Sequence, residues 1–451
     1  MGRVHLKGSY QKAELDHSVP GLPVPSEWAK TGSHIYSKAT GNVLTAIDGT
    51  EYLDSTSCGL TNIIGYGREE LAEAAKEQML DLYHVPNFGG RVSIPFVELC
   101  EKLAEISPMD RFLIENSGSE IVDAAFKVAR LYWRAQGLNK YKIISLERAY
   151  HGVTFGALSA MGLPMCLCPD AGPLVPGFSA IPTPYCYLCR FGKTYPNCDI
   201  DCAQALEKEI EMQGADTVAA FIGEPVQGGG GCIVPPKEYW PKIREICTKH
   251  NVLLIIDEVI TGFGRTGKFW GHEHWGIKPD LMTMAKGLAS GYVPIAALGI
   301  PEWIYKELIK SDKPFVHVHT FGGHSVCCAV ALKNIEIILR ENLVERGAKL
   351  GEYFQKRMAE IGEKSHYVGD AHGIGMWGRM QIVADKRTKE LFPPEKQAAN
   401  RIGARIVAEK QTFAGSWGED ILMCGLPPAS PQEDVDYLLD AIEWGVTTFQ
   451  P

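Results

Sequence analysis

The sequence predicts an α/β fold, with a large domain on a mostly parallel sheet covered by helices and a smaller α/β domain formed by both chain termini. Three observations predict it. Short apolar runs rich in β-branched residues recur through the middle of the chain, amphipathic stretches lie between them, and the two ends follow a different pattern. The 451 residues, 45% of them hydrophobic and 22% charged, are enough to bury a large core.

The middle of the chain alternates strand and helix signals. Residues 142–146 (KIISL), 219–226 (AAFIGEPV) and 252–260 (VLLIIDEVI) predict strands. Residues 120–135 and 237–250 place apolar side chains at helical spacing. The order strand, crossover helix, strand is typical of a parallel sheet with both faces covered.

The two ends predict the smaller domain. Residues 43–64 indicate short strands and turns, and residues 365–451 alternate strands with helices after a long helical pattern from about 325 to 362. No internal repeat is evident. The expected segments are 1–75 for the N-terminal part of the small domain, 76–330 for the large domain and 331–451 for the C-terminal part.

Charge and cysteine content exclude several classes of protein. The net charge of -9 comes without any Lys/Arg-rich block, which argues against nucleic acid or an anionic membrane as a partner. No apolar run approaches the ~18 residues that span a bilayer, and the first residues lack a signal-peptide pattern, so we expect a cytoplasmic protein. The odd number of cysteines, 13, indicates reduced thiols rather than a disulfide framework.

A buried strand that ends in two acids is the most informative segment. In residues 253–267 (LLIIDEVITGFGRTG), Asp257 and Glu258 close the strand and a glycine-rich loop follows. The carboxyl ends of parallel strands are where α/β sheets bind ligands. Taken alone, the two acids could equally cap the loop.

Lys286 follows 29 residues after Asp257, in residues 280–300 (DLMTMAKGLASGYVPIAALGI). Apolar neighbours should desolvate the lysine and favour its neutral amine, which can attack an aldehyde. If Lys286 is considered without the other motifs, the alternative is a surface lysine whose side chain lies along apolar neighbours.

Two further turns carry candidate binding groups. Ser117, Gly118 and Ser119 lie between a predicted strand and a helix that begins near Glu120, and unpaired helix N-terminal amides bind phosphate. Tyr150 and His151 follow another strand, where an aromatic ring can lie against a heteroaromatic cofactor. Taken alone, the first turn could be a helix cap, and the second could hold residues that pack in the interior without a ligand.

These four pieces together supply what pyridoxal phosphate (PLP) chemistry needs: an amine for the aldehyde, an acid for the pyridine nitrogen, a phosphate cradle and a ring platform. The sequence resembles the class III (ω-amino acid) aminotransferases of the fold-type I PLP family over nearly its whole length. The matching segments are NVLTAIDGTEYLD, NSGSE, YHG, GEPVQGGGG, DEVITGFGRTG, AKGLASGYVPIAA and HTFGGHSVCCAVALKNIE.

The resemblance implies roles for individual residues. Lys286 is expected to hold the cofactor as a Schiff base and to shuttle the proton once released, and Asp257 to pair with the pyridine nitrogen. Thr320 is expected to reach the phosphate of a neighbouring subunit, which implies a homodimer with shared active sites, or a tetramer. The remaining expected cofactor-binding residues are Ser117, Gly118 and Ser119 at the phosphate, Tyr150 and Val259 on the ring faces, and His151, Glu224 and Gln227 beside them.

The C-terminal end departs from the family pattern. Many relatives carry an arginine there for a substrate carboxylate, whereas residues 421–431 read ILMCGLPPASP. Arg379 and Arg91 are the alternatives, and either could bind an anion or be solvated.

A cysteine-rich insertion at residues 185–202 predicts a possible second site. Cys186, Cys189, Cys198 and Cys202 form a C-x2-C-x8-C-x3-C arrangement. Four such thiols either bind a structural zinc or pack without metal.

The resemblance implies a ping-pong aminotransferase that passes the amino group of a small amine or ω-amino acid, such as taurine or β-alanine, to a 2-oxo acid such as pyruvate. The alternatives are an amino-acid racemase, epimerase or aminomutase, a decarboxylase, or a binding protein that has lost catalysis.

Overall fold

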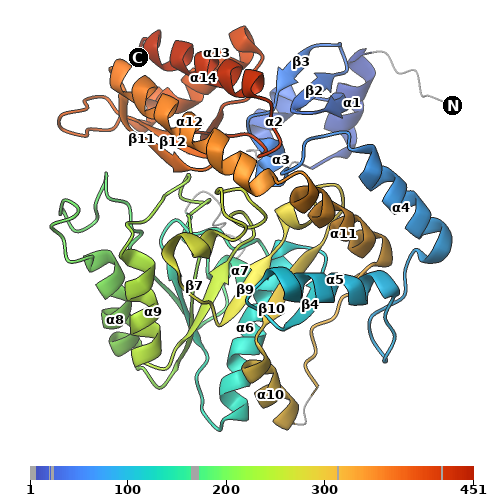
Figure 1. Cartoon of the computed structure of the whole chain (residues 1–451). Helices are drawn as coiled ribbons and strands as arrows, with labels where there is room; N and C mark the ends of the chain where they lie inside the picture. Colours follow the sequence, from blue (N-terminus) through green and yellow to red (C-terminus); the bar gives the residue numbers. More distant parts are fainter. Residues whose placement is uncertain (1–6, 20, 22–24, 164–171, 312–313, 418–419) are drawn as a thin grey trace.

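Seven strands form the central sheet in the computed structural model, which describes residues 7–19, 21, 25–163, 172–311, 314–417 and 420–451 (Figure 1). Their order is β4-β10-β9-β8-β7-β5-β6, and only β10 runs antiparallel to its neighbours. The predicted mostly parallel α/β fold is therefore confirmed. The strands are β4 (Arg111–Glu115), β5 (Lys142–Leu146), β6 (Phe178–Ile181), β7 (Val218–Gly223), β8 (Leu253–Asp257), β9 (Leu281–Met284) and β10 (Ala296–Ile300).

Helices cover both faces of this sheet, and alternate side chains of each strand pack against opposite layers. Ile255 of β8 packs with the core of α6 (Gly118–Ala135), whereas Ile256 packs with the core of α8 (Asp201–Gln213) and α9 (Tyr239–Lys249). Every residue of β7, β8 and β9 is buried, as the continuous apolar runs predict. A third core lies under α4 (Glu69–Leu82), α5 (Ile94–Ile106) and α11 (Ser325–Arg340).

The two ends of the chain lie side by side above the large sheet (Figure 1). A four-stranded antiparallel sheet, β11-β12-β14-β13, packs against three helices, and a three-stranded N-terminal sheet, β1-β2-β3, adjoins it. Leu53 bridges to Thr412 and joins the two. The elements are β1 (Tyr36–Thr40), β2 (Val43–Ala46), β3 (Glu51–Leu53), β11 (Val368–Ile374), β12 (Trp377–Ile382), β13 (Gly415–Trp417), β14 (Ile421–Gly425), α12 (Leu343–Lys364), α13 (Ala398–Lys410) and α14 (Gln432–Thr447).

The long helical pattern from about 325 to 362 is two helices rather than one. Helix α11 ends at Arg340, and Asn342, with φ of 50°, turns the chain into α12. Asparagine tolerates this left-handed conformation better than most residues. The remaining helices are α1 (Lys7–His17), α2 (Pro25–Thr31), α3 (Ser57–Leu60), α7 (Phe155–Ser159) and α10 (Glu302–Lys310). Among the described residues, none of the helices is both long and apolar enough to span a membrane.

Candidate active site

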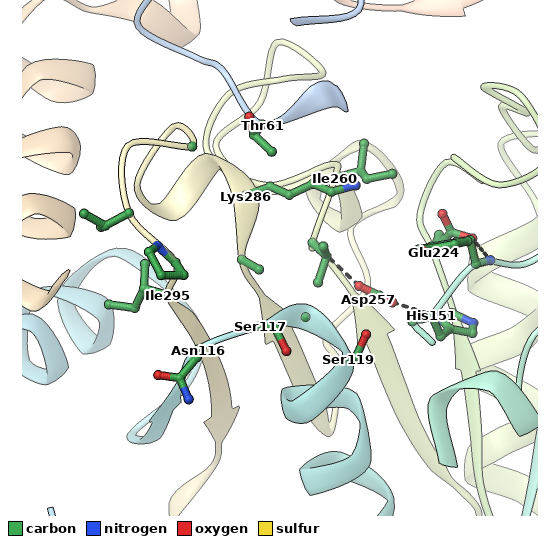
Figure 2. Close-up of a pocket in the computed structure, with 18 of the residues that line it drawn as sticks. Thr61, Asn116, Ser117, Ser119, His151, Glu224, Asp257, Ile260, Lys286 and Ile295 are labelled. Atoms are coloured by element: carbon green, nitrogen blue, oxygen red, sulfur yellow. Dashed lines mark hydrogen bonds and ion pairs between the residues drawn. The ribbon is translucent and has the colours of Figure 1, made fainter. Parts of the chain in front are cut away.

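One edge of the large sheet opens into a cavity of about 500 Å³. Parallel strands β4, β5, β7, β8 and β9 all end at this edge, and antiparallel β10 begins there. The loops that follow these ends carry Ser117, Tyr150, Glu224, Asp257 and Lys286 to the cavity wall. Figure 2 shows the side chains of Ser117, Glu224, Asp257 and Lys286 around one space, with Lys286 across from Ser117. The sheet topology thus brings together residues that lie far apart in the sequence.

Lys286 follows strand β9 and is partly buried at the cavity wall. Burial lowers the pKa of its amine, and the guanidinium of Arg265 acts in the same direction, whereas the carboxylates of Glu224 and Asp257 oppose the shift. The residue has φ of 43°, an uncommon conformation for a lysine. The site therefore favours the neutral, nucleophilic amine at a fixed position.

Asp257 ends strand β8 with both carboxylate oxygens held. The Val259 amide and the Thr283 hydroxyl donate to Oδ1 at 3.1 and 3.0 Å, and His151 Nδ1 lies 2.7 Å from Oδ2. Burial lowers the pKa of His151, but the hydrogen bond and charge of Asp257, together with Glu224, raise it overall. The three contacts hold the buried Asp257 carboxylate in one orientation.

The N-terminus of α6 faces the same cavity. The Ser117 hydroxyl accepts from the Glu120 amide at 3.3 Å while the Glu120 carboxylate accepts from the Ser117 amide at 3.0 Å, which is a capping box. The Ser119 hydroxyl accepts from the Val153 amide at 3.1 Å. A Cβ at Gly152 would approach the Ser119 Cα to 2.8 Å, so only glycine lets the two loops meet. This helix terminus can cradle a phosphate.

Glu224 connects two loops of the site. Its carboxylate accepts from the Tyr150 amide at 3.1 Å and from the Gly228 amide at 2.7 Å. Burial raises the pKa of Glu224 to about 7, against the opposing charge of His151. Behind Tyr150, a Cβ at Gly229 would lie 2.7 Å from the tyrosine Cβ. The glycine-rich loop therefore lets Tyr150 sit at the cavity wall.

The cavity fits PLP in each of its parts. Lys286 offers the amine, Asp257 the acid, the α6 terminus the phosphate cradle, and Tyr150 and Val259 apolar surfaces for the ring. Nine of the expected residues line the cavity: Ser117, Gly118, Ser119, Tyr150, His151, Glu224, Asp257, Val259 and Lys286.

Two expected residues lie elsewhere. The Gln227 side chain donates to the Glu147 carbonyl at 2.9 Å, and its backbone pairs with Ile233. Thr320 is exposed, and His84 Nε2 lies 2.9 Å from its carbonyl oxygen. Gln227 thus shapes the loop behind Tyr150. Contact of Thr320 with a neighbouring subunit stays a prediction.

Several lining residues were not expected from the sequence. Asn116 stands directly before Ser117, and its place at a strand end was a usable signal. Glu258, by contrast, is a structural residue, since the amides of Gly271 and His272 donate to it at 2.9 and 2.8 Å. The other unexpected lining residues are Thr61, Gly152, Ile260, Ala285, Gly291, Tyr292, Val293, Pro294 and Ile295.

No arginine lines the cavity in the described part of the chain. Arg91 is exposed. Arg379 is fully buried in β12, where its guanidinium donates to Gln381 Oε1 at 2.7 Å and to the Tyr185 hydroxyl at 3.0 Å. Arg379 is therefore neither solvated nor open to a substrate in the cavity.

Comparisons with known proteins agree with this site. Residues 26–409 match the sequence pattern of the family described as "Aminotransferase class-III". The chain is 36% identical to the taurine--pyruvate aminotransferase of Bilophila wadsworthia, over 98% of this chain and 99% of that protein. It is 38% identical to the putrescine--pyruvate aminotransferase of Pseudomonas aeruginosa, over 85% of this chain and 84% of that protein.

Solved structures show the same likeness. A thermostable (S)-enantioselective omega-transaminase from Thermomicrobium roseum superposes with a TM-score of 0.94 at 37% identity, covering 98% of this chain and 99% of that one. A transaminase from the marine bacterium Virgibacillus gives a TM-score of 0.92 at 34% identity, covering 97% and 98% of the two chains. The fold, the cavity and these relatives together show that the chain belongs to the class III aminotransferases.

Proposed function

We propose that this aminotransferase uses PLP to move an amino group from a small amine or ω-amino acid to a 2-oxo acid, with pyruvate as the acceptor. The observation that carries the proposal is the amine of Lys286, whose pKa is lowered, in one cavity with Asp257 and the α6 terminus. Two relatives named as pyruvate aminotransferases, one for taurine and one for putrescine, support the acceptor.

PLP, when bound, supplies an aldehyde that takes up the amino group and a ring that accepts negative charge. Lys286 would hold it through the side-chain amine. Once released, Nζ of Lys286 would act as the base that takes the proton from the donor carbon. The lowered pKa of Lys286 suits this role because the amine must be neutral to accept a proton.

Asp257 would hold a proton on the pyridine nitrogen, and His151 would keep the carboxylate charged and oriented. The 2.7 Å contact between His151 Nδ1 and Asp257 Oδ2 supports these two roles. Ser117 and Ser119 would bind the phosphate at the positive end of α6. His151, Glu224 and Asp257 are buried, and exclusion of water from these three side chains strengthens the interactions among them.

The donor is tested with a panel of taurine, β-alanine, putrescine and simple monoamines, each with pyruvate or 2-oxoglutarate. We expect pyruvate to support turnover and 2-oxoglutarate to be poor, because no arginine of the described chain lines the cavity to hold a second carboxylate. Preference for 2-oxoglutarate would contradict the proposed acceptor.

The same protein distinguishes an aminotransferase from an isomerase or a decarboxylase. With donor alone, an aminotransferase stops after one equivalent of oxo product per active site. A racemase, epimerase or aminomutase turns over without an acceptor, and a decarboxylase releases carbon dioxide.

We further propose a homodimer in which Thr320 completes the partner's phosphate site. Around Thr320, exposed apolar side chains gather on two segments that touch through His84: Val316, Val318 and Phe321 on one, and Phe88 on the other. An exposed apolar surface of this kind suits a second copy of the chain. Light scattering that gives the mass of one chain at working concentration would rule this out. The cytoplasmic location stays a prediction.

A further inference from the structure

The insertion between β6 and α8 is a cysteine-rich segment without regular secondary structure. Residues 184–200 contain only turns and irregular chain, and many of their side chains are exposed. Such a segment buries too little apolar surface to fix its own conformation. Cys186, Cys189, Cys198 and Cys202 all carry free thiols.

All four cysteines line one small cavity. Its volume is about 20 Å³, and the loop residues around it include Arg190 and Lys193. A space of roughly 10–15 Å³ is enough for one water molecule, so this cavity has room for a single ion. It is separate from the active-site cavity, since the two share no lining residue.

We propose that this cavity is a structural zinc site with Cys186, Cys189, Cys198 and Cys202 as the four ligands. Zinc is the ion of choice for four thiolates, which it binds in a tetrahedron at about 2.3 Å. The number and type of donors match a closed structural site, which leaves no open position for catalysis.

The surroundings of the cavity suit a site of negative charge. Four thiolates and one Zn²⁺ leave a net charge of -2. Arg190 lies at the same cavity, as does Lys193, which is paired with Asp201 at 2.5 Å. Cys202 lies in the first turn of α8, at the positive end of that helix.

Metal binding requires a local adjustment. In the described residues no three of these sulfur atoms lie within 4.8 Å of one another. The four residues already surround one cavity, so ligation needs their side chains to turn inward. Cys186, Cys189 and Cys198 lie on irregular chain, and Cys202 lies in the first turn of α8. Zinc binding would therefore order the loop, and part of the binding free energy would become folding free energy.

The loop has a structural connection to the interior. Tyr185, next to Cys186, is buried under the guanidinium of Arg379, whose carbon lies 4.4 Å from the tyrosine ring centre. Arg379 also donates to the Gly230 carbonyl, in the glycine-rich loop behind Tyr150. Fixing Cys186 would hold Tyr185 on Arg379, and so support the wall of the active site.

The test is the metal content of the intact holoenzyme, purified without chelators and dialysed before inductively coupled plasma mass spectrometry. We expect one zinc per chain, lost in a Cys198→Ser/Cys202→Ser protein and retained in Cys327→Ser, which removes a partly buried thiol of α11 outside the loop. Less than a tenth of a zinc per chain in the wild type, about the background of adventitious metal, overturns the proposal.

A second measurement on the wild type does not depend on variants that fail to fold. Blocking thiols with a mercurial should release the zinc in step with the reaction of four cysteines, and a strong chelator should lower the Tm of the holoenzyme. If the mercurial releases the zinc while these cysteines stay unreacted, the proposal is overturned. A count below the 13 thiols of the sequence in the denatured, unreduced protein also overturns it, since that indicates disulfides.

Discussion

His151 Nδ1 and Asp257 Oδ2 lie 2.7 Å apart in the interior of the site, and both side chains are almost fully buried. The pair joins two strand ends that are separated by 106 residues in the sequence. A buried carboxylate needs such a partner because an isolated charge in this setting is costly. The contact with His151, together with the donors at Oδ1, fixes the direction of the Asp257 carboxylate.

Asp257→Asn should leave the protein folded but lower kcat by about 100-fold or more, equivalent to at least ~2.7 kcal/mol of barrier. The asparagine amide is neutral, so it lacks the negative charge that stabilises a protonated pyridine nitrogen. Steady-state kinetics on the folded variant measure this loss. An activity within threefold of the wild type would contradict the assigned role.

His151→Asn should have a smaller effect, about 10-fold in kcat, because Asp257 keeps its two other donors, the Val259 amide and the Thr283 hydroxyl. The raised pKa of His151 means that its stabilising contribution is complete below the unfolded-state pKa and is lost as pH rises through the folded-state value. The wild type should therefore lose more stability than the variant on raising the pH through that range. Parallel Tm curves for the two proteins would show that the pair does not titrate.

Glu224→Gln should change the pH dependence of stability. Burial raises the pKa of Glu224 to about 7, so ionisation above that pH costs the folded state free energy. In the wild type the Glu224 contribution is favourable at low pH and lost as pH rises through about 7. We expect the Tm of the variant minus the Tm of the wild type to be larger at pH 8 than at pH 5. Differential scanning fluorimetry of both holoenzymes measures this difference. A constant difference would show that Glu224 keeps one protonation state over this range.

Gly152→Ala should weaken cofactor binding, because the added Cβ would meet the Ser119 side chain and disturb the phosphate cradle. Gly137→Ala is the matched control: Gly137 also has positive φ, but its Cβ would find no atom within 4 Å. Alanine costs roughly 1 kcal/mol of backbone strain at Gly137, with φ of 77°, and more at Gly152, whose φ of 131° lies outside the left-handed helical region. Equal retention of PLP by the two variants during dialysis would contradict the proposed phosphate site.

Residues whose position follows from strand ends were predictable from the sequence. Asp257 and Ser117 stand where apolar runs stop, and a parallel sheet brings such ends to one edge. Gln227 was assigned to the site by its motif, but a local bridge to Ile233 turns its side chain toward Glu147. Such side-chain directions depend on tertiary contacts that the sequence pattern does not carry.

Arg379 and the break at Asn342 illustrate the same limit. The alternation of β12 does not reveal that both of its faces are buried, so the interior position of Arg379 was not foreseen. Apolar spacing continues from α11 into α12, and only the backbone at Asn342 separates them. The domain boundaries at 75 and 330 stay predictions.

The most direct measurement is borohydride reduction of the holoenzyme followed by peptide mapping, since reduction fixes the cofactor to the amine that carries it. The cofactor should be found on the peptide that contains Lys286, and a Lys286→Ala protein should show no covalent cofactor and no transamination. A cofactor adduct on a different lysine, or full activity in Lys286→Ala, would contradict the role of Lys286.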